Sequence, residues 1–150
     1  MKVNEIVIAN RFIADLKLSK FDKVIRLSVL KNYMVLNKIT KEFETKTEDL
    51  RKKMFDDKQE EAQKVQEIRE RLQKSKTQEE FLACTEELKQ YKDFLDLEDE
   101  FIKLLNEESS KEVENIELTK IDRTKFVESL AASGIEFTPR DIDKVEIIFK

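Results

Sequence analysis

The sequence predicts a mainly α fold: a long antiparallel helical hairpin of coiled-coil-like character with a small C-terminal α+β cap. Charged residues make up 41% of the 150 residues, against about a quarter in an average globular domain. Glycine and proline occur once each, whereas sandwiches and barrels need both residues in their many turns. Apolar residues recur at heptad spacing over two long stretches. These observations are together typical of long, solvated helices.

The first helix is expected to run from Asn4 to about Leu18. Asn4 is a candidate N-cap, and the apolar residues that follow form one broad helical stripe. These residues are Ile6, Val7, Ile8, Phe12, Ile13 and Leu16. Residues 19–22 break the pattern, and Asp22 is expected to cap the next helix.

A second, much longer helix is expected from Lys23 to about Phe55. Its heptad seam consists of Val29, Asn32, Leu36, Ile39, Phe43, Leu50 and Met54. A second apolar stripe, Leu27, Leu30 and Met34, widens the early part. We therefore expect this helix to be buried broadly at its start and along a narrow seam further on.

A third and a fourth helix are expected after a soft turn at residues 56–58. Residues 59–74 carry a helical pattern, and Thr77 with Glu80 forms a capping box that starts the next helix. The seam of that helix is Phe81, Cys84, Leu88, Tyr91, Leu95, Glu98, Ile102 and Leu105. As one helix of roughly 45 Å, it would pair antiparallel with the helix from Lys23, with residues 59–74 at the distal end of the hairpin.

The pattern changes after Asn106, where a polar linker (107–112) precedes the expected cap. Residues 113–121 are predicted to form a strand because apolar residues partly alternate there. The closing residues 145–149 are also predicted to form a strand, one that is covered on both faces rather than open at an edge. The predicted division is a helical hairpin over 1–111 and an α+β cap over 112–150, which packs on the hairpin base within a single structural domain.

Two short helices are expected between these strands. Asp122 is a candidate N-cap, and Gly134 is placed to end the first of them as its C′ residue. Thr138 and Pro139 then predict a second helix start, with proline in the first turn.

The composition argues against an enzyme. The chain has no histidine, one cysteine and one glycine, so zinc sites, Glu-x-x-His di-iron sites, Ser-His or Cys-His nucleophile pairs and glycine-rich phosphate loops lack their residues. We predict no catalytic, cofactor-binding or metal-binding residues, although chemistry based on carboxylate, lysine or tyrosine side chains stays open. Cys84 is expected to pack in the core.

Two polar residues interrupt the apolar seams, Asn32 and Glu98. A buried polar residue can set the register of a coiled coil. We expect this structural role for both residues rather than a ligand site.

Charge is unevenly distributed, although the net charge is only −4. Residues 16–41 hold seven basic residues and one acid, a balance of +6, while residues 86–117 hold twelve acids and four lysines, a balance of −8. Either the two segments support each other or one face meets a partner of opposite sign. The candidate partner-binding residues are Lys17, Lys20, Lys23, Arg26, Lys31, Asp93, Asp96, Asp99 and Glu100.

No apolar run exceeds four residues, whereas a membrane span needs about twenty. We expect no membrane span and no signal peptide, and the single cysteine fits a cytosolic location. The acidic pI of about 5.2 argues against nucleic acid as the main partner. Weak nucleic-acid binding through Lys17–Lys41 stays a third, lower-ranked hypothesis, and closure of a seam by a second copy is left open.

The order of elements resembles a family of small uncharacterised bacteriophage and prophage proteins of Gram-positive bacteria, defined by a domain of unknown function. The matching residues are Asn4, Glu5, Ile6, Leu16, Lys17, Leu18, Lys31, Asn32, Glu42, Phe43, Glu44 and Arg51. The ending, IELTKID at 116–122 and FTPRDIDKVEIIF at 137–149, is also similar to that family. Ser19 stands where family members often have proline after Lys-Leu. The resemblance implies a viral origin, with a place in the host cytoplasm or in the virion, and carries no site residues.

Two functions follow as hypotheses. The first is a non-enzymatic phage protein that acts through helical surfaces, as an assembly factor or a minor structural component. The second is a small acidic inhibitor of a host nucleic-acid enzyme or defence system, with residues 86–117 in a basic groove. Both require a protein partner, either viral or host.

Overall fold

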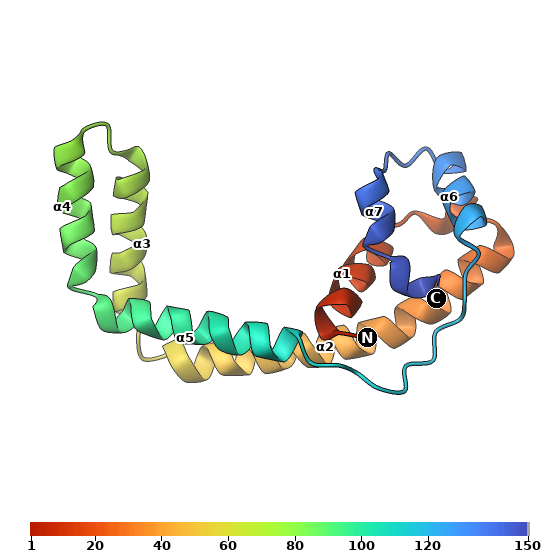
Figure 1. Cartoon of the computed structure of the whole chain (residues 1–150), viewed down its shortest axis with the longest axis horizontal. Coiled ribbons are helices and arrows are strands. Elements are labelled where there is room, and N and C mark those ends of the chain that lie inside the picture. Colours follow the sequence, from red (N-terminus) through yellow and green to blue (C-terminus); the bar gives the residue numbers. More distant parts are fainter. Residues whose placement is uncertain (150) are drawn as a thin grey trace. The chain divides into compact units, whose positions relative to one another are not determined.

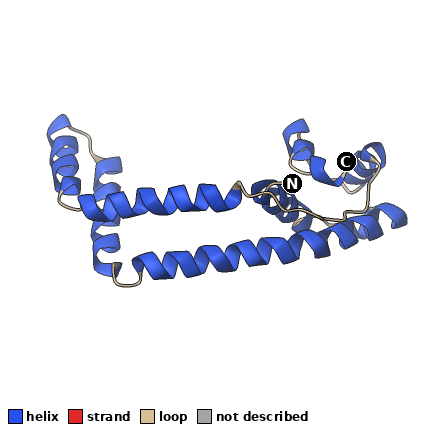
Figure 2. Ribbon diagram, turned by 60° about the horizontal axis from the view of Figure 1, so that its bottom comes forward, coloured by secondary structure: helices blue, strands red, loops and turns tan. Residues whose placement is uncertain are grey.

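The computed structural model describes residues 1–149, and these residues are mainly helical (Figure 2). The helices are α1 (Val3–Ala14), η1 (Leu18–Lys20), α2 (Lys23–Phe55), α3 (Gln59–Lys74), α4 (Gln78–Lys89), α5 (Lys92–Ser109), α6 (Arg123–Ala132), α7 (Pro139–Asp143) and η2 (Glu146–Ile148), where η denotes a 3₁₀-helix. The chain divides into two compact units: unit 1 comprises residues 1–45 and 107–150, and unit 2 comprises residues 46–106. The prediction of a mainly α fold is confirmed.

Unit 1 has a single apolar core, which α1, the first part of α2, α6 and the C-terminal residues build together (Figure 1). Phe126 of α6 is its aromatic centre, since its ring meets Phe21 edge-on at 5.9 Å and Phe149 at 5.3 Å between centroids. Ile25, Val29 and Leu36 supply the buried side of α2. Their spacing places them on one side of the helix.

Asn32 ties the extended segment after α5 to this buried side of α2. Its side-chain Nδ2 donates to the carbonyl of Thr119 at 2.8 Å, and its Oδ1 accepts the N–H of Thr119 at 2.7 Å. Asn32 is only 1% exposed, so both hydrogen bonds satisfy an amide that would otherwise be buried without a partner. The structural role expected for Asn32 is therefore correct in kind, but it joins a helix to an extended segment rather than helix to helix.

Neither predicted strand is present among residues 1–149. Residues 113–121 form no ladder. Asn115 breaks the stretch with a φ of 58°, and the N–H of Val113 donates to the carbonyl of Met1 and that of Ile121 to the carbonyl of Ile148. An isolated antiparallel bridge joins Lys2 to Glu112. The closing residues form a turn and η2 instead of a strand. An alternating or consecutive apolar pattern indicates that residues are buried, but it does not require a sheet. Here helices and turns bury them.

The expectation that the closing residues are covered is confirmed, since Val145, Ile147, Ile148 and Phe149 are all buried. The capping predictions in this region also hold. Asp122 Oδ1 accepts the N–H of Lys125 at 3.0 Å, and Gly134 follows α6 with a φ of 68°. Pro139 occupies the first turn of α7 behind Thr138. Local hydrogen-bonding chemistry therefore determines where these short helices begin and end.

The first two helices lie near the predicted residues, with two corrections to the first of them. Asp22 caps α2 as expected, because its Oδ1 accepts the N–H of Val24 at 2.9 Å. Asn4 is not the N-cap of α1, which begins at Val3 and ends at Ala14 rather than Leu18. Glu5 accounts for the earlier start, because its carboxylate accepts the N–H of Lys2 at 2.9 Å.

Unit 2 contains the end of α2 together with α3, α4 and most of α5. Helices α3 and α4 lie side by side (Figure 1), and Thr77 caps α4 through the N–H of Glu80 as predicted. Phe55 at the end of α2 meets Phe94 and Phe101 of α5 edge-on, at 5.7 and 5.4 Å. The end of α2 thus packs on α5, while pairing along the rest of the expected hairpin stays a prediction.

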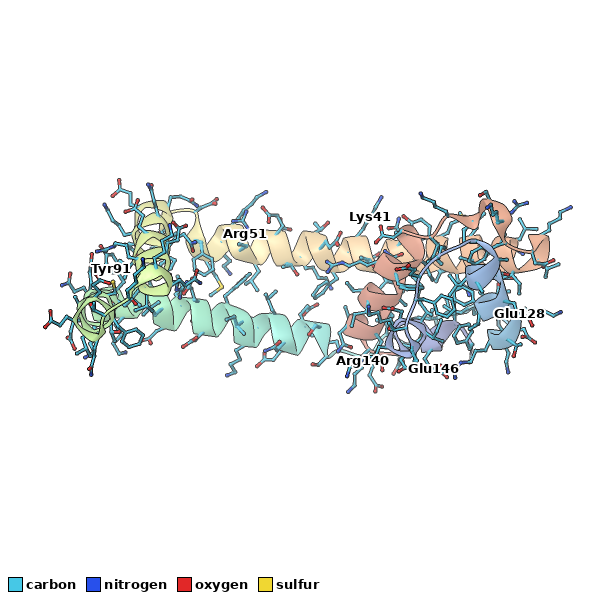
Figure 3. All side chains as sticks on the ribbon, turned by 90° about the horizontal axis from the view of Figure 1, so that it is seen from above. Lys41, Arg51, Tyr91, Glu128, Arg140 and Glu146 are labelled. Atoms are coloured by element: carbon cyan, nitrogen blue, oxygen red, sulfur yellow. The ribbon has the colours of Figure 1, made fainter. Side chains whose placement is uncertain are left out.

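The prediction of one continuous helix over residues 77–106 is wrong. α4 ends at Lys89 and α5 begins at Lys92, with Tyr91 at the break (Figure 3). The N–H groups of Gln90 and Tyr91 donate to carbonyls three residues back, which tightens and ends α4. The two halves meet different helices: α4 packs on α3, and α5 packs on Phe55. A straight helix could not serve both contacts.

We expect Asn32→Ala to lower the free energy of unfolding by about 1–3 kcal/mol, because two hydrogen bonds to Thr119 are lost. The matched control is Asn37→Ala, the same change on the same helix at a half-buried position, which subtracts the gain in helix propensity. Urea unfolding measures both. Equal midpoints and slopes for the two variants would contradict a stabilising role for Asn32.

We expect α7 to lose its N-terminal cap in acid as Asp141 is protonated. Hydrogen bonds from Lys144, and from the backbone and side chain of Thr138, lower the pKa of Asp141 to about 2. Since the folded pKa lies below the unfolded value of about 3.9, the cap stabilises α7 above about pH 4 and is lost as the pH falls towards 2. NMR titration of the carboxyl and of the α7 amides measures this.

The Asp141→Asn variant should lack the acid transition of the α7 amides, while Asp143→Asn should retain it. Asp143 lies in the same helix, but its side chain is 71% exposed and 4.0 Å from Arg123. An α7 transition that survives in the Asp141 variant would assign the change to another group.

Candidate functional site

The side of α2 that faces away from the core of unit 1 carries exposed apolar residues. Val24, Leu27, Leu30 and Met34 are 68%, 49%, 44% and 73% exposed. Val24, Leu27, Lys31, Met34 and Lys38 follow one another at spacings of three and four residues, and we call this row the exposed seam. Such spacing places the five residues in one line along the helix.

The expectation that Leu27, Leu30 and Met34 broaden the buried start of α2 is therefore wrong. The core of unit 1 meets α2 through Ile25, Val29 and Leu36, on the opposite side of the helix. Hydrophobic periodicity identified both apolar sides of this helix. The periodicity does not indicate which of the two sides other elements of the fold cover.

Basic side chains lie within and beside the exposed seam. Of the five basic candidates, Lys17 precedes η1 and Lys20 is its last residue. Lys23, Arg26 and Lys31 lie on α2. The four lysines are exposed and Arg26 is half-buried. Within the described part of the chain, Lys23, Lys31 and Lys38 form no ion pair. Their charges are free to meet a partner, and Lys41 extends them further along α2 (Figure 3).

Two surface grooves border the exposed seam within unit 1. One, of about 680 Å³, includes Lys20, Val24 and Ser28 on one wall and Lys125 of α6 on the other. A second, of about 560 Å³, lies between Met34 and Val35 of α2 and the extended residues 113–117. The half-buried Val113 and Ile116 line this second groove. The apolar surface thus continues from the seam onto a neighbouring segment, which also brings Glu114 and Glu117 to the groove.

The acidic candidates belong to unit 2, where Asp93, Asp96, Asp99 and Glu100 are exposed along α5. Asp96 accepts a hydrogen bond from Lys92 at 2.6 Å, and this bond raises the pKa of Lys92. The structure thus gathers the four acids on one helix, and the basic candidates lie in unit 1.

Unit 2 also holds an aromatic cleft that the sequence patterns did not reveal. It has a volume of about 420 Å³ and is lined by Phe55, Phe94 and Phe101, with Arg69 and Glu98 beside them. Glu98 accepts two hydrogen bonds from Arg69, at 3.0 and 2.6 Å. These bonds raise the pKa of the Arg69 guanidinium. The polar residue in the seam of α5 therefore joins α5 to α3.

Cys84, the single cysteine, is buried, in agreement with the predicted core position. Over residues 1–149, no group of three or more histidine, cysteine, aspartate or glutamate side chains is arranged to hold a metal ion. None of the described helices combines the length and the apolar character that a membrane crossing requires.

Comparisons with known proteins return no match to a protein-family model, to a curated protein or to a solved structure. The resemblance to phage proteins therefore stays a prediction from the sequence.

We expect the two sides of α2 to differ sharply in their contribution to stability. Leu36 is buried completely, so Leu36→Ala should lower the free energy of unfolding by about 2–5 kcal/mol. Leu30→Ala, the same change on the exposed side, should change it by less than about 1 kcal/mol. Thermal and urea unfolding of the two variants measure the difference. Similar losses in both would show that the side carrying Leu30 is covered in solution.

Proposed function

We propose that this protein is a non-enzymatic interaction protein that binds a partner protein through the exposed seam of α2. The observation that carries the proposal is the row of apolar side chains, from Val24 to Met34, that the core of unit 1 leaves uncovered. Exposed apolar rows of this kind are costly in water and mark interaction surfaces. The lack of histidine and the single glycine and cysteine support a role in binding rather than in catalysis.

The resemblance to small phage proteins supports a more specific role. In that setting the protein acts as an assembly factor or a minor structural component, either in the host cytoplasm or in the virion. A narrow helical surface suits such a role, because assembly partners commonly dock an amphipathic helix against another helix or groove.

A second candidate function has its own supporting observation. The exposed acids Asp93, Asp96, Asp99 and Glu100 give α5 an acidic surface, and such a surface suits the basic groove of a host nucleic-acid enzyme. In this alternative, α5 rather than α2 carries the activity. Replacing the four acids by their amides would then abolish inhibition, whereas changes in the exposed seam would not.

Site-specific photo-crosslinking tests the first proposal. With a photo-reactive amino acid at Met34, we expect one discrete adduct with a partner protein in the native cells of the protein. The same amino acid at Lys103, an exposed position of α5, is the matched control and should give no such adduct. Mass spectrometry of the adduct identifies the partner and the contacted peptide.

Two results would overturn the proposal. One is the lack of any protein adduct from Leu27 and Met34, tested separately, when the protein is at its natural abundance. The other is steady turnover of a substrate by the purified protein. Adducts that form from α5 alone would favour the acidic inhibitor instead.

A further inference from the structure

We infer that the partner presents an acidic amphipathic helix, which packs along the exposed seam in the manner of a two-stranded coiled coil. This inference rests on the proposed function and adds the shape and charge of the occupant. Two features of α2 carry it: the spacing of the seam and the positions of its lysines.

The spacing selects a helix as the occupant. In heptad terms Val24, Lys31 and Lys38 occupy a positions, and Leu27 and Met34 occupy d positions. Leu30 and Val35, also exposed, flank the row at g and e positions. The row spans 14 residue steps, or about 21 Å, which corresponds to two heptads. An a/d row of this length presents the holes into which the side chains of a second helix insert.

The lysines select an acidic occupant. Lys31 stands inside the row, between Leu27 and Met34, and Lys38 ends it, and neither has an ion-pair partner among the described residues. A helix that covers Leu27 and Met34 must also cover the lysine stems. The two ammonium groups then need carboxylates on the occupant, since a covered charge without a partner is costly. Lys23 and Lys41 add charge of the same sign.

The same charges disfavour the other occupants. A second copy that paired in parallel through this row would place Lys31 and Lys38 opposite the same lysines, with repulsion in place of pairing. A membrane surface takes a helix whose apolar side is continuous, whereas Lys31 interrupts this row and Lys38 ends it. Nucleic acid binds through phosphate contacts and would leave Leu27 and Met34 uncovered.

Two synthetic peptides of 21 residues test the inference with the intact protein. Both have leucine at every d position; one carries glutamate and the other lysine at every a, e and g position. We expect the acidic peptide to bind at least tenfold more tightly than the basic one, by fluorescence anisotropy. The double variant Leu27→Ala/Met34→Ala should weaken binding of the acidic peptide by at least tenfold, because it removes the apolar d positions.

Charge reversal provides the decisive comparison. Lys31→Glu/Lys38→Glu should invert the preference, so that the basic peptide binds more tightly. Lys74→Glu/Lys103→Glu changes the net charge by the same amount at exposed positions of unit 2 and should preserve the preference of the unchanged protein. Equal affinities for the two peptides, or inversion by both double variants, would overturn the inference.

Other outcomes identify other occupants and also overturn it. These are binding to phosphatidylserine vesicles that Leu27→Ala/Met34→Ala abolishes while neither peptide binds, and a dimer in light scattering that the same variant dissociates. Crosslinks from Met34 without any peptide preference would refute the acidic helix and leave the proposed function standing. An absence of crosslinks would refute the proposed function itself.

Discussion

The pairing of one side-chain amide with one peptide group organises unit 1. Asn32 is buried in α2 and holds the carbonyl and the N–H of Thr119 at 2.8 and 2.7 Å. An extended segment normally obtains such bonds from a neighbouring strand, and here a helix supplies them. The anchored segment then delivers Ile121, whose N–H reaches Ile148. Helix α6 follows at once, with Phe126 in the centre of the core.

This arrangement covers only one side of α2. The core residues Ile25, Val29 and Leu36 share that side with Asn32, and the C-terminal segments that could have wrapped around the helix are held there. The opposite side keeps its apolar row, with lysines that have no ion-pair partner within residues 1–149. The candidate binding surface is thus a direct result of where Thr119 is anchored, because no further element among the described residues of unit 1 covers Leu27 and Met34.

Most of the local capping was predictable from the sequence, and tertiary cover was not. Capping by Asp22, Thr77 and Asp122 rests on side chains that bond the nearest N–H groups, whereas Asn4 was displaced as a cap because the helix begins before it. Periodicity reports that a side is apolar but not what lies against it. The two predicted strands, the unbroken helix through Tyr91 and the buried stripe failed for this reason. The candidate lysines were predicted as surface charges. The sequence does contain one signal that this row is not core. Lys31 and Lys38 lie in line with Leu27 and Met34, and lysines are rarely buried.

The two sides of α2 impose different rules on how the chain can diverge over time. A change at Val29 or Leu36 can be compensated only inside this chain, by residues of the same core. Under the proposed function, a change at Leu27, Lys31 or Met34 would be compensated in the partner protein. Neighbouring positions such as Lys31 and Asn32 are therefore expected to co-vary with different sequences. Lys31 should vary together with the partner's sequence, and Asn32 together with the length and register of residues 113–121 of the same chain. In an alignment of related chains, positions along α2 would co-vary with residues of the same chain on one side of the helix and with residues of the partner protein on the other side. The two kinds of position would alternate with the helical period.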